Sequence, residues 1–311
     1  MTRRRRSAVD LSTRVGSVLL PNPVLTASGT AGHGDELGAY VDLGSLGAVV
    51  VKSLSADPWP GNPAPRVHET PAGMINSVGL QGPGVQHWLD EELPAVLATG
   101  ARVVASIWGT TVEDYARAAA MLAGAPAGVI AVEVNISCPN HHDRNRMFAH
   151  SPASTAEAIA AAAVCGRPMW AKLSPNVADL AAIAAAAAEA GAEAVTLINT
   201  VLGMAIDVET RTRRLGGGGG GLSGPAIHPV AVRAVHDVHA ALPELPIVGV
   251  GGVARGVDAV ELLMAGASAV QVGTASFADP RSVGRVLVEL DHWCADHGVR
   301  AVTELIGAVH G

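Results

Sequence analysis

Aromatic residues are scarce in this chain of 311 residues, because Phe, Tyr and Trp together make up only 3% of it. The core must therefore be built from Ala, Val, Leu and Ile, a composition typical of parallel sheets covered by helices on both faces. The sequence also lacks any run of ~18 uninterrupted apolar residues, so we expect no transmembrane helix. Its start carries charge but no apolar segment, so we expect no secretory signal.

Cysteine is also rare: Cys138, Cys165 and Cys294 are odd in number and widely spaced. They form neither a disulfide framework nor a zinc motif, and they are too few for an iron–sulfur cluster held by four thiolates. We expect the reducing cytoplasm as the compartment. No histidine pair has metal-ligand spacing on a helix, and the His141-His142 pair is more typical of a solvated loop, so no metal site is expected.

Positive charge is in deficit, with 21 basic against 28 acidic residues and a net charge of −7. A nucleic-acid partner is therefore not expected. The one basic cluster, Arg3 to Arg6, lies at the terminus, where solvated disorder is usual. We predict a disordered tail over residues 1–10 and a single domain over residues 11–311, because no linker divides the rest of the chain.

What the sequence does have is a regular alternation of short β-branched runs and Ala-rich helical patterns. Eight strands are predicted, at Pro23–Ala27, Ala48–Val51, Arg102–Ser106, Val129–Val134, Pro168–Leu173, Ala194–Ile198, Pro246–Val250 and Ala269–Val272. Helices are predicted between most of them, at Val112–Ala123, Ser154–Val164, Val177–Ala190, Pro229–Ala241, Gly256–Ala265 and Pro280–His297. This alternation predicts an α/β fold, a (β/α)8 TIM barrel. Ser12–Leu20 could add an N-terminal hairpin that closes the barrel bottom.

Long non-periodic segments follow three of these strands, at Ser53–Gln81, His141–Ser151 and Gly203–Pro229. Loops of such length inside a compact barrel are usually functional. Because each follows a strand, each should lie on the face that carries catalytic residues in such barrels.

Polar side chains gather where the predicted strands end. One lysine at a strand end more often reaches solvent, but two lysines, two asparagines and a cysteine should converge here on one pocket: Lys52, Lys172, Asn135, Asn199 and Cys138. Cys138 sits on a turn, because Pro139 cannot extend a central strand. Two interpretations of Cys138 are open: a catalytic base or nucleophile, and an inert buried thiol. Cys165 and Cys294 are expected to be packing residues.

Glycine turns suggest a phosphate site. Gly249 to Gly252 close the seventh predicted strand, and Gly273-Thr274 follow the eighth. Exposed backbone N–H groups at such turns commonly bind phosphate in these barrels, although tight turns without a ligand are the alternative. No GxGxxG opens the first strand–helix unit, so a Rossmann nicotinamide site is not indicated.

At these residues the chain resembles the class 1 dihydroorotate dehydrogenases, FMN enzymes of pyrimidine synthesis, over essentially its whole length. The motifs that carry the resemblance are Asn76–Gln81, Asn135–Asn140, Lys172–Asn176, Ile198–Thr200, Leu222–Ile227 and Gly249–Gly252. Ser223–Ile227 is similar to the 1B branch, which works with a separate electron-transfer subunit.

The resemblance implies residue roles. Cys138 matches the catalytic base, and Lys172 is expected to stabilise the reduced flavin. The FMN contacts implied are Ser28, Lys52, Ser53, Ser106, Asn135, Lys172, Ile198, Gly224, Gly251, Gly252, Gly273 and Thr274. The dihydroorotate contacts implied are Lys52, Asn76, Ser77, Val78, Gly79, Leu80, Asn135, Asn140, Asn199 and Thr200.

Three positions depart from the family pattern. Ser106 stands where an asparagine usually contacts FMN, so that contact is expected to be weaker or bridged by water. The segment His141 to Arg146 is more charged than the expected glycine-rich lid, which puts strict dihydroorotate specificity in doubt. The glycine run Gly216 to Gly221 is expected to be mobile.

Reoxidation of reduced FMN needs an acceptor, and this chain has neither the cysteines for a cluster nor a dinucleotide fingerprint. The hypothesis is a partner subunit that carries FAD and a 2Fe–2S cluster and passes electrons to NAD, with a homodimer inside a heterotetramer as the resemblance implies. The alternatives are a 1A-type enzyme that uses fumarate, a dehydrogenase of another dihydropyrimidine, and a non-redox barrel that binds a phosphorylated metabolite.

Overall fold

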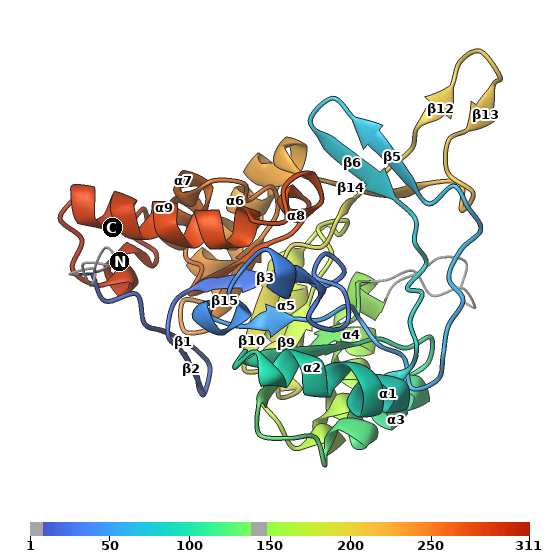
Figure 1. Cartoon of the computed structure of the whole chain (residues 1–311), viewed down its shortest axis with the longest axis horizontal. Coiled ribbons are helices and arrows are strands. Elements are labelled where there is room, and N and C mark those ends of the chain that lie inside the picture. Colours follow the sequence, from blue (N-terminus) through green and yellow to red (C-terminus); the bar gives the residue numbers. More distant parts are fainter. Residues whose placement is uncertain (1–8, 138–147) are drawn as a thin grey trace.

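The computed structural model describes residues 9–137 and 148–311. Its centre is a parallel sheet of eight strands that follow one another around the molecule (Figure 1). In chain order these are β3 (Val24–Thr26), β4 (Val49–Val50), β7 (Val103–Ile107), β8 (Val129–Asn135), β9 (Met169–Lys172), β10 (Ala194–Leu197), β15 (Ile247–Val250) and β16 (Ala269–Val272). The edge strands β3 and β4 meet through a parallel bridge between Leu25 and Ala48. The sheet is thus nearly closed, and the predicted (β/α)8 barrel is confirmed.

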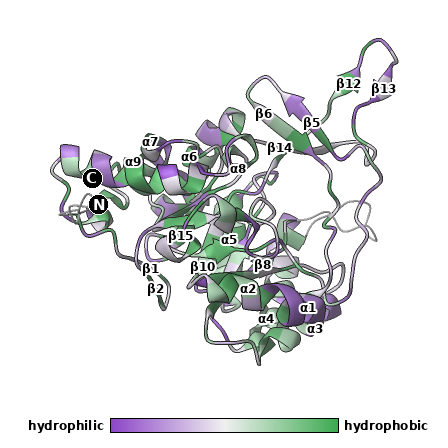
Figure 2. Ribbon diagram, viewed as in Figure 1, coloured by the Kyte–Doolittle hydropathy of each residue, from purple (hydrophilic) through white to green (hydrophobic). Residues whose placement is uncertain are grey.

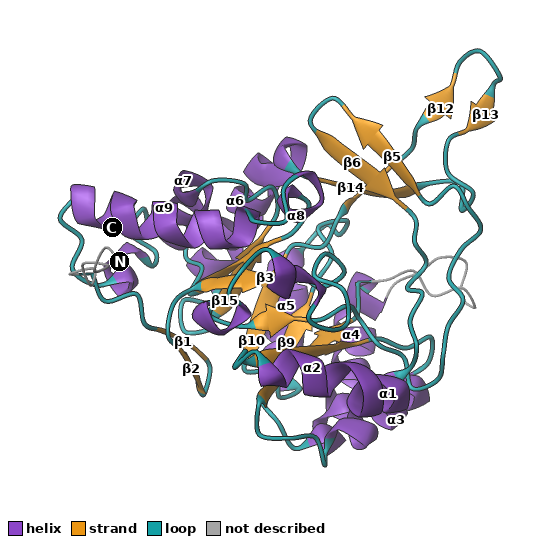
Figure 3. Cartoon of the chain, in the orientation of Figure 1, coloured by secondary structure: helices purple, strands orange, loops and turns teal. Residues whose placement is uncertain are grey.

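Helices connect the strands and cover the outside of the barrel (Figure 3). The longer ones lie within a few residues of the predicted ranges: α3 (Val112–Leu122), α4 (Pro152–Ala162), α5 (Leu180–Glu189), α6 (His228–Ala241), α7 (Gly256–Met264) and α9 (Ser282–Asp296). The shorter ones are α1 (Val85–His87), α2 (Leu93–Ala98) and α8 (Ala275–Ala278). Helix α5 begins three residues later than predicted because the Asp179 carboxylate accepts a hydrogen bond from the Ala182 N–H and caps the helix.

The predicted N-terminal hairpin is present, as β1 (Thr13–Val15) paired antiparallel with β2 (Val18–Leu20). Val15, Val18 and Leu20 are buried in a cluster with inward residues of the barrel strands, among them Leu25 and Trp170. This apolar plug fills the barrel opposite its carboxyl end. Figure 2 shows the barrel strands coloured mainly as hydrophobic, as expected for strands buried on both faces.

A small antiparallel sheet stands beside the barrel mouth and was missed from the sequence. Its strands, in spatial order, are β11 (Val201–Gly203), β14 (Gly220–Ser223), β6 (Gly73–Asn76) and β5 (Val67–Thr70). It joins two of the long segments expected to be loops, and with the hairpin of β12 (Ile206–Asp207) and β13 (Thr212–Arg213) it projects from the barrel (Figure 1).

The glycine run differs from its predicted loop. Gly220 and Gly221 belong to β14, where Gly220 pairs with β11 and Gly221 pairs with both β11 and β6. A Cβ atom on Gly220 would lie 2.4 Å from the Asn76 carbonyl oxygen, and one on Gly221 would lie 1.9 Å from Thr200 Oγ1. The expectation of a mobile glycine run is therefore wrong for these residues, because glycine serves here for close packing between strands.

Both ends of the described chain pack together. Asp10, which the sequence assigned to the tail, forms a parallel bridge with Ala301, whereas residues 1–8 lie outside the described part. Within the described ranges, no helix combines the length and apolarity that a bilayer span requires.

Candidate active site

A cavity of about 670 Å³ lies at the carboxyl ends of the barrel strands, which is a usual size for a small-molecule site. It brings together nearly every residue that the sequence proposed. Those in its wall are Ser28, Lys52, Ser53, Asn76, Ser77, Val78, Gly79, Leu80, Asn135, Lys172, Ile198, Asn199, Thr200, Gly224, Gly251, Gly252, Gly273 and Thr274. The small sheet contributes one side of this wall, which explains why distant segments meet here.

Of the proposed residues that the structure describes, only Ser106 is not in that wall. Cys138 and Asn140 lie outside the described residues, as does the charged segment 141–146. Ser106 is completely buried and lies behind the wall, where its hydroxyl is 2.9 Å from Ser53 Oγ and donates to Glu133 Oε1 at 3.2 Å. Its position supports contact with the cavity through Ser53 rather than directly.

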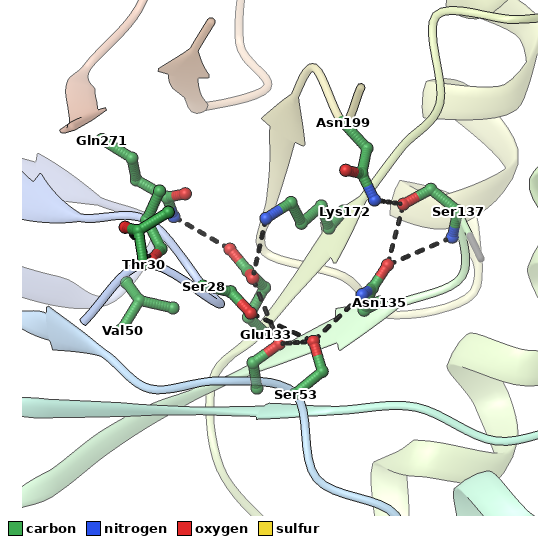
Figure 4. Close-up of polar contacts among 12 residues, drawn as sticks. Ser28, Thr30, Val50, Ser53, Glu133, Asn135, Ser137, Lys172, Asn199 and Gln271 are labelled. Atoms are coloured by element: carbon green, nitrogen blue, oxygen red, sulfur yellow. Dashed lines mark hydrogen bonds and ion pairs between the residues drawn. The ribbon is translucent and has the colours of Figure 1, made fainter. Parts of the chain in front are cut away.

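A chain of hydroxyl groups runs inward from the cavity wall (Figure 4). Ser53 Oγ lies 3.0 Å from Ser28 Oγ and accepts a hydrogen bond from Asn135 Nδ2 at 3.0 Å. A carboxylate only accepts, so Ser106 must donate to Glu133, and Ser53 in turn must donate to Ser106. Ser53 then has only lone pairs left for Ser28 and Asn135. The direction of the whole chain therefore follows from the carboxylate at its end.

Asn135 and Asn199 are held together by Ser137. The Ser137 hydroxyl donates to Asn135 Oδ1 at 2.8 Å and accepts from Asn199 Nδ2 at 2.6 Å. The phenol of Tyr115, from α3, donates to the Asn135 backbone carbonyl at 2.9 Å. These contacts fix how both amides face the cavity, so the site presents a defined pattern of donors and acceptors.

Positive charge comes from two lysines. The Lys172 side chain is only 6% exposed and its Nζ lies 3.6 Å from Glu133 Oε1. Lys52 Nζ lies 3.8 Å from the place that a Cβ would take on Gly29. Burial, reinforced by the Lys52 charge, lowers the pKa of nearby His33. The cavity thus holds two cations suited to an anionic ligand.

Glycine turns form another part of the wall, as predicted. Gly251 and Gly252 follow β15 with φ of +143° and +70°, in the region that favours glycine. A Cβ there would lie 2.6 Å from Ala231 Cβ and 2.7 Å from His228 Cβ. The neighbouring turn is tied to β14 by Thr274 Oγ1, which donates to Ser223 Oγ at 2.8 Å. Backbone can therefore approach a ligand closely at this end of the cavity.

One buried side-chain oxygen of the wall lacks a partner in the part of the chain that the structure describes. The Ser77 hydroxyl is buried and makes no hydrogen bond among the described residues. Buried polar groups are nearly always satisfied, so this atom fits a site whose ligand supplies the missing partner.

Sequence reasoning missed several residues of the site. Ser137, which lies in the segment Asn135–Asn140, links the two amides of the site. Glu133 and Gln271 lie within strands β8 and β16 and are fully buried. Glu133 could have been placed near the site from the sequence, because it precedes Asn135 by two positions and side chains two apart in a strand share a face.

Fold and site together define a class: a (β/α)8 barrel enzyme with a cationic, amide-rich pocket at its catalytic face. The family model of dihydroorotate dehydrogenase matches residues 10–293. The chain belongs to the dihydroorotate dehydrogenase family and is an oxidoreductase.

Named relatives match over almost their whole length. The chain is 49% identical over 303 residues to the catalytic subunit of dihydroorotate dehydrogenase B (NAD(+)) of Desulforudis audaxviator, covering 97% of this chain and 98% of that protein. It is 46% identical over 301 residues to the subunit of the same name of Geobacter sp. strain M21, covering 96% and 98%. It is also 47% identical over 301 residues to a Solibacter usitatus protein provisionally named dihydroorotate dehydrogenase A (fumarate), covering 96% and 98%.

Proposed function

We propose that this protein oxidises (S)-dihydroorotate to orotate in the de novo synthesis of UMP, with FMN as its cofactor. The observation that carries the proposal is the convergence of Lys52, Lys172, Asn135 and Asn199 in one cavity of a chain of this family. Dihydroorotate has a carboxylate and ring amides, and these residues offer cations and amides that match both.

The cavity has the features that FMN needs. Gly251 and Gly252, with Gly273 and Thr274, would hold the phosphate through backbone N–H groups, because glycine lets the chain approach the anion. The unpartnered Ser77 hydroxyl offers a group for a ligand in the same cavity. Contacts to the rest of FMN would come from Ser28, Lys52, Ser53, Asn135, Lys172, Ile198 and Gly224.

Dihydroorotate would bind between the barrel mouth and the small sheet. Asn76, Asn199 and Thr200 would hold its ring, with the segment Ser77 to Leu80 beside it and Lys52 facing its carboxylate. The Ser137 link between Asn135 and Asn199 would keep their amides aligned with the ring. An analogue that lacks the matching groups would leave buried amides unpaired, which favours specificity. Asn140 would complete this set.

Oxidation removes a proton from one ring carbon and a hydride from the next. Cys138 is the proposed base, and the residue before it, Ser137, lines the cavity. A thiolate accepts the proton, and the ordinary thiol pKa of about 8.5 predicts that activity rises with pH toward that value. Bound FMN supplies the hydride acceptor. Lys172 would face the negative charge that a reduced flavin carries.

For reoxidation we propose a separate subunit that carries FAD and a 2Fe–2S cluster and delivers electrons to NAD, in a heterotetramer built on a homodimer. The names of the Desulforudis and Geobacter relatives, each a catalytic subunit of an NAD(+) enzyme, support this. Direct use of fumarate is the second candidate, favoured by the name of the Solibacter relative. Because identities to the two types are alike, only an experiment separates them.

Anaerobic mixing with dihydroorotate tests the central proposal. The purified chain should show flavin absorbance. Dihydroorotate should bleach this absorbance within seconds of mixing or faster, whereas dihydrouracil should leave it unchanged. Cys138→Ser should keep FMN but slow bleaching by about 100-fold or more, as expected for a lost general base. Cys165→Ala is the control, because that buried thiol lies on the segment after α4 and is not part of the cavity wall. A colourless protein that takes up no FMN would refute the proposal, and an unchanged rate in Cys138→Ser would refute the cysteine base.

A further inference from the structure

The inside of the barrel holds a carboxylate that neither the fold nor the proposed chemistry requires. Glu133 of β8 has no exposed surface and is not part of the cavity wall. Barrel interiors are usually filled with branched apolar residues, and a buried carboxylate costs several kcal/mol of desolvation unless it is well paired. Among the described residues it is one of two buried carboxylates, and the other, Asp258, caps α7 outside the barrel.

Glu133 is fully engaged from three directions (Figure 4). Its Oε2 accepts from Gln271 Nε2 at 2.9 Å, and its Oε1 accepts from Ser106 Oγ at 3.2 Å and lies 3.6 Å from Lys172 Nζ. Gln271 belongs to β16, which β15, β10 and β9 separate from β8 in the sheet. The Glu133–Gln271 bond therefore crosses the barrel interior and fixes the carboxylate between the apolar plug and the cavity.

The contact with Lys172 is unlike the other ion pairs. Of all ion pairs among the described residues it alone has both side chains buried, at 6% and 0% exposure. In such a setting charges are weakly screened and act strongly on one another. A lysine that served only to attract an anion would need no partner below it. Glu133 lies beside the ammonium, where its negative charge opposes part of the field that Lys172 exerts on the cavity.

We propose that Glu133 is a positioning residue that orients the Lys172 ammonium and offsets its charge, and thereby limits how strongly the cavity stabilises a negatively charged reduced flavin. This inference rests on the proposed binding of FMN. It assigns to the barrel interior a tuning of the flavin's reduction potential, through a residue that touches neither cofactor nor substrate.

The key variant is Glu133→Gln, which removes the charge at nearly constant shape. It should fold, because the new amide oxygen can still accept from Ser106. Rotation of the Gln271 amide by 180° would turn its Oε1, which has no partner among the described residues, toward the new N–H as an acceptor. With Lys172 no longer offset, reduced flavin should be favoured at least tenfold, which for a two-electron couple is a rise of about 30 mV in midpoint potential. The potential is read by equilibration with a reference dye under anaerobic conditions.

Two further variants show whether the effect passes through Lys172. Lys172→Met should lower the potential, and adding Glu133→Gln to it should change the redox equilibrium less than threefold. Asp258→Asn is the matched control for loss of a buried carboxylate and should leave the potential unchanged, because it acts at the start of α7. If Glu133→Gln unfolds, Glu133→Asp keeps the charge but withdraws it from Lys172, and a smaller rise is expected.

The outcomes separate this inference from the proposed function. A wild-type chain that binds no FMN would overturn both. A flavin-bearing Glu133→Gln protein with an unchanged or lower potential would overturn only the role of Glu133, as would a rise of equal size in the Lys172→Met background.

Discussion

Asn135 shows how a single side chain in this site is held by partners from several elements. Its amide nitrogen donates to Ser53, its amide oxygen accepts from Ser137, and its backbone carbonyl accepts from Tyr115. The hydroxyl of Ser53 passes on to Ser106 and so to Glu133. The orientation of an amide at the cavity thus depends on a carboxylate three hydrogen bonds away. In a network of this kind, the donor or acceptor role of each group fixes the role of the next, so the whole network has one arrangement.

The buried thiol of Cys294 should make stability depend on alkaline pH. Burial, with the Asp291 and Glu304 carboxylates nearby, raises its pKa from 9.0 to about 11. The folded state favours the neutral thiol. The contribution of this thiol to the free energy of unfolding is therefore complete below pH 9 and is lost as the pH rises toward 11. Cys294→Ala should therefore flatten the fall of the unfolding free energy over this interval by on the order of 2 kcal/mol, measured by urea unfolding at several pH values. A slope equal to that of the wild type would contradict this.

At the residue scale, the sequence predicted the side chains that end a strand but not those within one. Lys172 and Asn199 were found because polar groups at the carboxyl ends of parallel strands share one face. Gln271 was missed because a single polar residue in an apolar run gives no sign of whether it is paired across the barrel. Ser106 was assigned to FMN by resemblance, and its burial behind Ser53 is a consequence of packing that no single sequence reveals.

Among the elements, the hairpin of β1 and β2 is expected to carry much of the stability of the barrel bottom. Leu20 is fully buried in the apolar plug, whereas its neighbour Leu19 is 58% exposed. Leu20→Ala should lower the unfolding free energy by about 2–5 kcal/mol, and Leu19→Ala, the matched control, by less than about 0.5 kcal/mol. Urea unfolding of both variants checks this. Equal losses would mean that the hairpin does not pack as a plug.

The barrel strands were predictable because each is a short β-branched run set between helical patterns. The small sheet was not, since its pairing joins Leu222 of β14 to Ile75 of β6 across a long stretch of chain. Pairing over such a distance has no local periodicity, and β14 is rich in glycine, which is usually depleted in strands. Gly221 shows the reason for the exception: a Cβ there would collide with Thr200.

At the scale of the whole molecule, the electron acceptor is the open functional question. If a partner subunit is needed, dihydroorotate should reduce the flavin of the isolated chain, but NAD should turn over slowly and fumarate should not restore the oxidised flavin. Addition of an NAD(+)-type electron-transfer subunit should then raise NAD reduction by about 100-fold. Rapid turnover of the lone chain with NAD would contradict the partner, and rapid turnover with fumarate would establish the second candidate.

The small sheet also determines which segments could be exchanged between this protein and its relatives in a chimera. Its four strands come from two insertions, one after β4 and the other after β10, and β6 and β14 bond directly to one another. A chimera that received only one insertion would place foreign side chains along that shared seam and opposite native glycines. The two insertions therefore form one structural unit. Grafting them from one family member into another should transfer the ligand specificity of the barrel mouth only when both are grafted together.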